Sequence, residues 1–249
     1  MYEHFQISHP SERVALVTMN RPAKLNAMNR EFFRELMAVM DQLDSLSVGA
    51  AVITGAGRAF SAGGDIGSFA ELGDIRAYRA HLRLVYEAFH RVEKADAPVI
   101  AAVNGIAYGG GTELVLACDL AVASREARFA FKEPTVGLMP GYGVIRGPEV
   151  IGKRATRLLA LTGRDVDALG AKELGLVDEV VAPDELLSFA LALGEEIAAQ
   201  PPLAVRVAKQ FINRHQDVPG LPESIEATAL LFTTDDHKTA VARFLTRKQ

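Results

Sequence analysis

Apolar and polar residues follow two different periods along this chain, and each period predicts one kind of secondary structure. Runs of apolar and β-branched residues predict strands at 13–19, 50–54, 99–103, 120–123 and 177–181. Apolar residues spaced three or four apart predict helices at 29–46, 75–94, 112–118, 153–161 and 168–173. Because strands and helices alternate, we expect an α/β fold with a largely parallel sheet.

From residue 184 onward only the helical period remains, so we expect a core at 1–183 and a helical oligomerisation region at 184–249. Prolines and a glycine within 201–202 and 220–222 predict three helices in this region. The last of these helices carries an apolar stripe made of Leu230, Leu231, Phe232, Val241 and Phe244. Such a stripe can pack on the core or on a second copy of the chain, and we expect a subunit contact.

Composition excludes several classes of protein. The 249 residues are 49% hydrophobic and 23% charged, as in a globular protein, and the net charge of −4 argues against a nucleic-acid partner. A single cysteine, Cys118, excludes an internal disulfide and fits a reducing compartment, so we expect a cytoplasmic protein. There is no run of about 18 apolar residues and no leader-like N-terminus, so we expect no association with a membrane.

Several familiar sites fail on spacing. The third glycine of a dinucleotide-binding fingerprint would fall at Phe60, and Ser61 does not have the glycine spacing of a nucleophile elbow. The six histidines show no metal-ligand spacing, so we expect no metal. What remains is a pair of glycine-rich turns and two glutamates.

The most informative segment is 98–119, PVIAAVNGIAYGGGTELVLACD. It predicts a buried strand, then a turn with three successive glycines at 109–111, then a helix whose first turn carries Glu113. The positive end of that helix faces the turn, where negative charge on an oxygen would be stabilised. This segment alone leaves two interpretations open, a structural turn with a capping glutamate or a functional site.

A second glycine-rich turn, at 55–65, also follows a predicted strand. Parallel neighbouring strands would bring both turns to the same edge of the sheet, where ligands of α/β proteins bind. One N–H from each turn can then hold one oxygen. Glu113 and Glu133 both lie in apolar or glycine-rich surroundings, and paired carboxylates tend to split their pKa values, so that one gives a proton while the other takes one.

At this point the chain resembles the crotonase family, the enoyl-CoA hydratases and isomerases. The resemblance covers most of residues 12–182. It rests on NRPAKLNAM at 20–28, GRAFSAGGDI at 57–66, AAVNGIAYGGGTELVLACDLAVAS at 101–124, and GLMPGYG at 137–143 followed by LTGRDVDALGAKELGLVDEVV at 161–181. The combination is far more specific than any one string.

The resemblance implies a crotonase-like spiral of repeated ββα units with C-terminal helices that assemble homotrimers, often paired as hexamers. It also implies an acyl-CoA substrate, with coenzyme A as part of that substrate and no separate cofactor. By position in the motifs, the thioester oxygen would be held by the N–H groups of Gly64 and Gly110. The residues that would bind the substrate or its coenzyme A portion are Arg21, Lys24, Ala62, Asp65, Ile66 and Gly141.

Both positions that hydratases of this family occupy with glutamate are glutamate here, Glu113 and Glu133. We therefore expect reversible hydration of a trans-2-enoyl-CoA, with Glu113 deprotonating water and Glu133 protonating Cα. Isomerisation of a double bond and thioester hydrolysis are the closer alternatives, and a non-catalytic RNA-binding relative is the more distant one.

Three departures from the family pattern stand out. Residues 142–148 read YGVIRGP where a small residue and GGTQRL are usual, which alters the wall near Glu133. Lys132 precedes Glu133 where proline is common; it is either a solvated side chain, which we favour, or a charge that lowers the pKa of Glu133. The chain stops short of the usual K-P-x-F ending, so Lys248 is a poor candidate for a phosphate contact.

Overall fold

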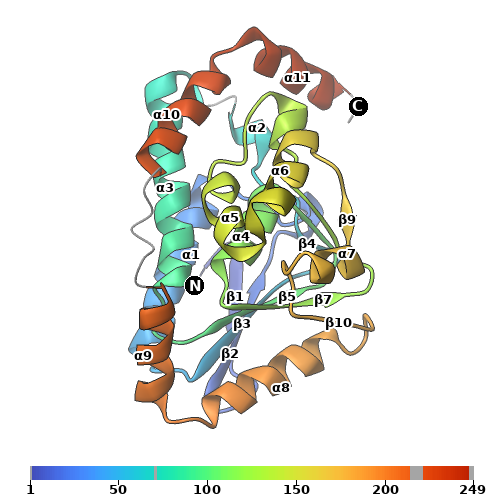
Figure 1. Ribbon diagram of the computed structural model, residues 1–249. Coiled ribbons are helices and arrows are strands. Elements are labelled where there is room, and N and C mark those ends of the chain that lie inside the picture. The colour runs from blue at the N-terminus through green and yellow to red at the C-terminus, as the bar shows by residue number, and fades with distance from the viewer. Residues whose placement is uncertain (1, 70–71, 214–220, 247–249) are drawn as a thin grey trace.

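Two sheets lie against each other under a cover of helices in the computed structural model, which describes residues 2–69, 72–213 and 221–246 (Figure 1). The larger sheet has the order β1 (Phe5–Ser8), β2 (Val14–Met19), β3 (Ala50–Gly55), β5 (Val99–Val103), β7 (Leu120–Ser124), β10 (Glu179–Val181). The smaller sheet has the order β4 (Ala59–Ser61), β6 (Ile106–Tyr108), β8 (Arg128–Ala130), β9 (Val166–Asp167). Within the described residues only the pairs β1–β2 and β8–β9 are antiparallel, so the expected parallel α/β core is confirmed.

The chain passes between the two sheets three times in the same way. Strands β3, β5 and β7 of the larger sheet are followed by β4, β6 and β8 of the smaller one, and each pair leads into helical structure. The helices that follow are α2 (Ile66–Phe69) with α3 (Ile75–Glu93), α4 (Gly110–Ala117), and η3 (Glu133–Val136) with α5 (Gly143–Val150). This is the repeated ββα unit that the resemblance implies.

The predicted strands are confirmed, whereas β1 and the whole smaller sheet were not predicted. Every residue of β5 is buried, as its unbroken apolar run requires when both faces of a parallel strand are covered. The strands of the smaller sheet are only two or three residues long, too short to show a period of two. Most of β8 and all of η3 lie within 129–141, a segment whose glycines and prolines argue against a long regular element.

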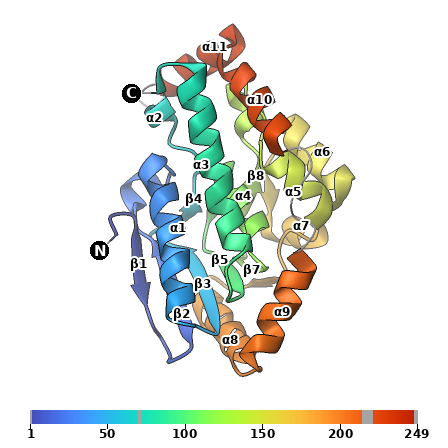
Figure 2. The same cartoon turned by 90° about the vertical axis from the view of Figure 1, so that its left-hand side faces the viewer.

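Helices α1 (Arg30–Ser45) and α3 run side by side over one face of the larger sheet (Figure 2). Asn29 caps α1: its side chain accepts a hydrogen bond from the Phe32 N–H and so satisfies a donor that the helix leaves open. Helix α8 (Leu186–Ala198) covers the other face, where a smaller apolar cluster joins it to β2, β3, β5 and β7. The division of the chain at residue 184 stays a prediction.

The C-terminal region contains four described helices, so the prediction of three is wrong. They are α8, α9 (Pro202–Asn213), α10 (Leu221–Phe232) and α11 (Asp235–Thr246). The unpredicted break between α10 and α11 has no glycine or proline; the hydroxyls of Thr233 and Thr234 bond instead to the carbonyls of Leu230 and Leu231.

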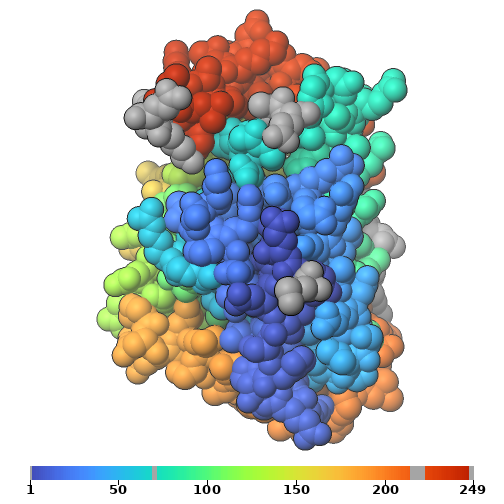
Figure 3. All heavy atoms as spheres, turned by 180° about the vertical axis from the view of Figure 1, so that it is seen from behind, coloured from blue at the N-terminus to red at the C-terminus, as the bar shows by residue number. Residues whose placement is uncertain are grey.

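Part of the expected subunit stripe packs on the chain's own core, which corrects that prediction. Phe232 stacks on Tyr78 of α3 with ring centres 4.1 Å apart, while Leu230 is 63% exposed. Helices α10 and α11 lie at one end of the molecule, and α8 and α9 lie at the opposite end (Figures 1 and 3). None of the helices in the described ranges combines the length and the apolar character needed to cross a bilayer. Lys248 lies outside the described residues.

Candidate functional site

A cavity of about 430 Å³ lies where the glycine turn before α4 meets α3 and η3. Most of the residues that the sequence marks as a site line this cavity. They are Ala62, Gly64, Ile66, Gly110, Glu113, Glu133 and Gly141. The two glycine turns meet at one edge because β3 pairs with β5, and β4 with β6, in parallel.

Two backbone N–H groups at the edge of the cavity are available to donate hydrogen bonds to a ligand. Gly64 forms a parallel bridge with Met28, in which Gly63 and Asp65 make the hydrogen bonds. In that pattern the N–H of the middle residue, Gly64, points away from Met28. Gly110 is the first residue of α4, so its N–H has no partner within the helix. A Cβ on Gly110 would lie 3.8 Å from the Gly64 nitrogen, which places the two donors close together.

Glu113 is buried and held by the first turn of α5. Its Oε1 accepts a hydrogen bond of 2.8 Å from the Gly143 N–H. Burial raises the pKa of Glu113 to about 7, against the opposing effect of hydrogen bonds from the Gly143 and Tyr142 N–H groups to the carboxylate. The side chain therefore changes its protonation state near neutral pH.

The carboxyl group of Glu133 has fewer hydrogen-bond partners among the described residues than that of Glu113. Its Oε2 is buried and has no hydrogen-bond partner among the described residues. Burial, and after it the charge of Glu113, raises the pKa of Glu133 well above its ordinary value. Gly109 allows this close approach: its φ of +52° suits glycine, and a Cβ there would lie 2.6 Å from Glu133 Oε1.

The two carboxyl groups are therefore suited to opposite proton transfers. At neutral pH Glu113 has access to its ionised form, while burial and the charge of Glu113 raise the pKa of Glu133 and so favour its protonated form. An ionised carboxylate can take a proton from water and a protonated one can deliver a proton to carbon. The nearby N–H groups of Gly64 and Gly110 can stabilise negative charge on an oxygen between them.

Three predicted binding residues do not line the cavity. Arg21 is ion-paired with Asp65, with both Nη atoms 3.3 Å from Asp65 Oδ2, and Lys24 is exposed at the end of η1 (Pro22–Lys24). This loop is held by Asn26, whose side-chain amide donates to the carbonyls of Ala56 and Ala59. Asn26 has a positive φ of 54° and is fully buried, a structural role that the motif alone did not reveal.

Lys132 lines the cavity but does not govern Glu133. Its Nζ lies 2.7 Å from Asp165 Oδ1 and 5.1 Å from the centre of the Tyr108 ring. The pKa of Glu133 is raised, by burial and by Glu113, so the hypothesis that Lys132 lowers it is wrong. The favoured view, a simply solvated side chain, also misses the ion pair.

Helix α3 forms part of the cavity wall, within the segment 66–90 that the sequence indicates for it, whereas sequence reasoning missed the part that the C-terminal helices contribute. Tyr78, His81 and Tyr86 of α3 face the cavity, together with Thr228 of α10 and Phe244 of α11. Burial raises the pKa of Tyr78 and of Tyr86 and lowers that of His81 to about 4, so all three are neutral at pH 7. The signal present in the sequence was the placing of polar rings on the apolar face of an amphipathic helix.

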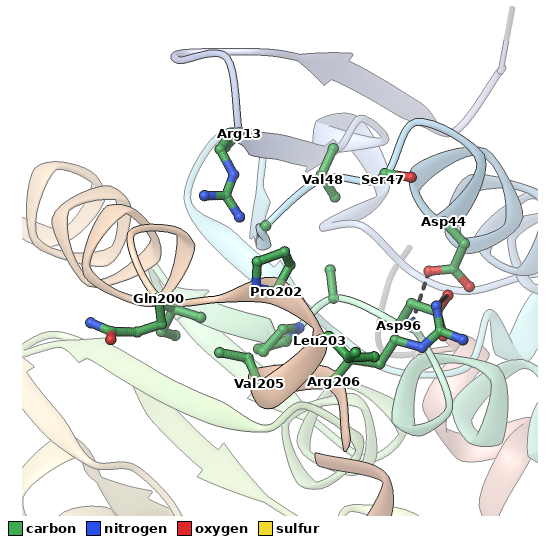
Figure 4. Close-up of a pocket in the computed structure, with 14 residues that line it drawn as sticks. Arg13, Asp44, Ser47, Val48, Asp96, Gln200, Pro202, Leu203, Val205 and Arg206 are labelled. Carbon is green, nitrogen blue, oxygen red and sulfur yellow. Dashed lines mark hydrogen bonds and ion pairs between the residues drawn. The ribbon is translucent and has the colours of Figure 1, made fainter. Parts of the chain in front are cut away.

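A second cavity, of about 410 Å³, lies at the far end of the molecule between α9 and the turns that follow α1 and α3 (Figure 4). Its carboxylates already have partners. Asp44 accepts a hydrogen bond of 2.9 Å from the Asp96 N–H, and Asp96 lies 3.0 Å from Arg206. The first cavity, with its buried glutamate pair and paired N–H donors, is the one equipped for chemistry.

Comparison with known proteins agrees with this geometry. The family described as Enoyl-CoA hydratase/isomerase matches residues 9–249. The short-chain-enoyl-CoA hydratase of Clostridium acetobutylicum is 37% identical over 243 residues, covering 95% of this chain and 93% of the relative. A probable enoyl-CoA hydratase of Rhizobium meliloti is 40% identical over 242 residues, with coverages of 95% and 93%.

A crystal structure of an enoyl-CoA hydratase/isomerase from Mycobacterium paratuberculosis superimposes with a TM-score of 0.90 at 32% identity, covering 98% of this chain and 99% of that one. The crotonase-like fold expected from the motifs is therefore confirmed. By sequence along almost its whole length, and by fold, this chain belongs to the enoyl-CoA hydratase/isomerase family.

Proposed function

We propose that the chain is an enoyl-CoA hydratase, which adds water reversibly across the double bond of a trans-2-enoyl-CoA. The observation that carries the proposal is the buried pair Glu113 and Glu133, lining one cavity with unequal surroundings beside two backbone N–H donors. The names of the relatives in Clostridium acetobutylicum and Rhizobium meliloti support the same reaction.

In this mechanism the thioester oxygen accepts hydrogen bonds from the N–H groups of Gly64 and Gly110. When water adds at Cβ, the electrons of the double bond move toward the thioester, and negative charge builds on that oxygen as in an enolate. The N–H groups and the positive end of α4 stabilise this charge. Loss of one such donor typically slows an enzyme about a hundred- to a thousandfold.

The proton transfers follow from the two carboxyl groups. Ionised Glu113 removes a proton from the attacking water, whose oxygen bonds to Cβ, and protonated Glu133 delivers a proton to Cα. The product carries OH on Cβ and one more hydrogen on Cα, so the atoms of one water are accounted for. Proton exchange then restores Glu113 to its ionised form and Glu133 to its protonated form, and dehydration is the reverse of these steps.

Coenzyme A enters this proposal as part of the substrate. We assign its adenosine and phosphate portion to the loop that bears Arg21 and Lys24, beside Asp65 and the main chain at Ala62 and Ile66. Lys24 is exposed and so accessible to a phosphate. Gly141 lines the cavity close to Tyr86, where it would form part of the wall around the acyl group.

The experiment replaces each glutamate with glutamine and follows loss of the enoyl thioester absorbance. Glu113→Gln and Glu133→Gln should each lower kcat by on the order of a hundred- to ten-thousandfold, because each removes one proton transfer. Near-normal turnover in both variants would contradict the mechanism. Product analysis with 2-enoyl-CoA and 3-enoyl-CoA separates hydration from isomerisation, which needs only the second glutamate.

We also propose that copies of the chain assemble as trimers, alone or paired as hexamers, in the cytoplasm. Apolar side chains that no described residue covers support assembly: on α9, Leu203 is 72% exposed and Ile212 is 78% exposed. The single thiol, Cys118, is in keeping with a reducing compartment.

A further inference from the structure

Helix α5 occupies the segment that departs most from the family pattern, and its first turn touches the chemistry. The N–H of Gly143 donates to Glu113 Oε1 at 2.8 Å, and the Tyr142 N–H also stabilises that carboxylate. A Cβ on Gly143 would lie 2.6 Å from the Phe131 ring, so the backbone at this point is packed tightly. The position of α5 therefore decides how well Glu113 is held.

A buried ion pair ties α5 to α3. Arg146, one turn after Gly143, places its Nε 2.6 Å from Oε1 of Glu93 in the last turn of α3, and the two side chains are only 6% and 3% exposed. The other oxygen, Oε2, lies 3.1 Å from Nδ1 of His90. Arg146 is also paired with Glu149 on its own helix. The guanidinium thus joins the two helices at one point.

Tyr142, the residue before Gly143, packs at the same contact between the two helices. Tyr142 is buried, with its ring 5.1 Å from that of Phe89 and 6.1 Å from that of Tyr86. After burial itself, the charge of Glu93 is the largest cause that raises the pKa of Tyr142, so phenol and carboxylate are neighbours. Both residues that donate to Glu113 are therefore anchored to α3, one by its ring and the other through Arg146.

We propose that the Glu93–Arg146 ion pair is a positioning device for Glu113, which holds the first turn of α5 against α3 so that its N–H groups stay on the Glu113 carboxylate. The inference rests on the proposed function, in which Glu113 must be ionised. Apolar residues of similar volume could pack two helices at least as firmly, because burying charges costs most of what their attraction returns. An ion pair adds a set distance and direction, which is what the hydrogen bond to Glu113 needs.

Among the described residues, the titratable groups that interact electrostatically with Glu113 are Glu133 from η3, Tyr78 and Tyr86 from α3, and Tyr142 just before α5. Burial keeps the three phenols neutral near pH 7. Of these four groups, only the carboxyl group of Glu133 can therefore carry a charge that acts on Glu113 near that pH. Hydrogen bonds to a carboxylate lower its pKa, so losing them raises the pKa of Glu113. Loosening α5 must then move the acidic limb of the rate profile to higher pH.

The test compares the full-length enzyme with the double variant Glu93→Gln/Arg146→Gln, using 2-butenoyl-CoA as substrate. The two substitutions remove opposite charges together, so they leave no unpaired buried charge and no change in net charge near Glu113. We expect the acidic limb of kcat/KM to rise by about one pH unit and kcat at pH 7 to fall about fivefold, because the ionised fraction of Glu113 drops from about one half to about one eleventh, with KM little changed. The single variant Arg146→Lys keeps the charge, so its acidic limb should shift less than that of the double variant.

A matched control removes a different buried ion pair. Lys209 of α9 lies 2.7 Å from Asp119, just after α4 and outside the cavity. Lys209→Gln/Asp119→Asn should lower the melting temperature and leave the acidic limb in place. If the double variant at 93 and 146 does not fold, Glu93→Asp provides the test, because it keeps both charges and only shortens the side chain that meets Arg146. An acidic limb at the wild-type pH in that variant would overturn the proposal.

A readout without turnover separates this inference from the proposed function. Infrared difference spectra between each enzyme and its Glu113→Gln counterpart follow protonation of Glu113 directly. A shifted titration in an enzyme that hydrates no enoyl-CoA would sustain the positioning role and reject the hydratase. An active hydratase whose Glu113 titrates at the same pH with and without the ion pair would reject the positioning role alone.

Discussion

Glu113 and Glu133 are the same residue type, yet their neighbours give them different chemistry. Glu113 is met by two N–H groups from the start of α5, which oppose the effect of burial on its pKa. Glu133 has a buried Oε2 with no hydrogen-bond partner among the described residues, and it also feels the charge of Glu113. The roles that we propose for them, base for Glu113 and acid for Glu133, therefore follow from what surrounds each carboxyl group.

This difference predicts a bell-shaped pH dependence for hydration. Glu113 acts ionised and its pKa is raised to about 7, so kcat/KM should fall as the pH drops below that value. Glu133 acts protonated and its pKa is raised well above the ordinary value, so the rate should fall again on the alkaline side. Initial rates with 2-butenoyl-CoA across the pH range check this, and a profile without an acidic limb would exclude Glu113 as the base.

Gly109 leaves the space that the Glu133 carboxyl group occupies. Gly109→Ala places a Cβ 2.6 Å from Glu133 Oε1, so the acid must move, and we expect kcat to fall by about a hundredfold, as misplacement of a catalytic group can. The control is Gly73→Ala, which meets a similarly positive φ of +67° but has no atom within 4 Å. Both variants should lose about 1–3 kcal/mol of unfolding free energy, and only the first should lose activity. Equal kcat in the two would show that the space at Gly109 is irrelevant.

At the scale of elements, helices distant in sequence complete the cavity. Helix α3 supplies the polar rings, and α10 secures them: the Ser224 hydroxyl lies 2.9 Å from the Tyr86 hydroxyl and 2.7 Å from the Gly141 carbonyl oxygen. A Cβ on Gly141 would lie 1.8 Å from the Tyr86 oxygen, so glycine is required for this contact. One buried serine thus joins α10, α3 and the loop that leads into α5.

Ser224→Ala should therefore weaken the fold and the site together. It leaves a buried hydroxyl and a buried carbonyl with fewer partners, which typically costs about 1–3 kcal/mol. We expect the midpoint of urea unfolding to drop and KM to rise as the wall at Gly141 loosens. Ser188→Ala, at an exposed serine of α8 with one local hydrogen bond, is the control and should change neither. A KM equal to that of wild type would argue against a role of α10 in binding.

At the scale of the whole molecule, the cavity and the most exposed apolar helix lie apart. The site is built between α3, α4 and η3, whereas α9 extends along the opposite end beside α8 (Figures 1 and 2). Leu203 and Ile212 of α9 are among the most exposed apolar side chains, an unusual placement unless a second copy covers them. Assembly can then stabilise the chain without blocking the cavity.

The double variant Leu203→Glu/Ile212→Glu should shift the proposed trimer or hexamer toward monomer, because it places charges in the apolar contact that we propose. Light scattering coupled to size-exclusion chromatography measures the mass directly. Leu46→Glu, at the end of α1 where the side chain is 52% exposed, should leave the mass unchanged. A wild-type protein that runs as a monomer at micromolar concentration would refute the assembly.

The sequence by itself determined the longer elements of the core and the candidate site residues. Strands such as β5, the cap of α1 and the glycines at 109–111 follow from local chemistry, since burial of a run, one side-chain acceptor and the absence of Cβ atoms are each written in a few neighbouring residues. The motifs therefore sufficed to place Glu113, Glu133, Gly64 and Gly110 together in one family pattern.

Only the tertiary structure decided how those groups are held. The two-residue and three-residue strands of the smaller sheet, helix α5 and the contact of Ser224 with Tyr86 depend on residues far apart in sequence, 138 positions in the last case. The same holds for Arg146 and Glu93, which show no pattern until α5 packs on α3. Local periodicity states which face of a helix is buried, whereas its partner and the pKa values that result are set by long-range packing.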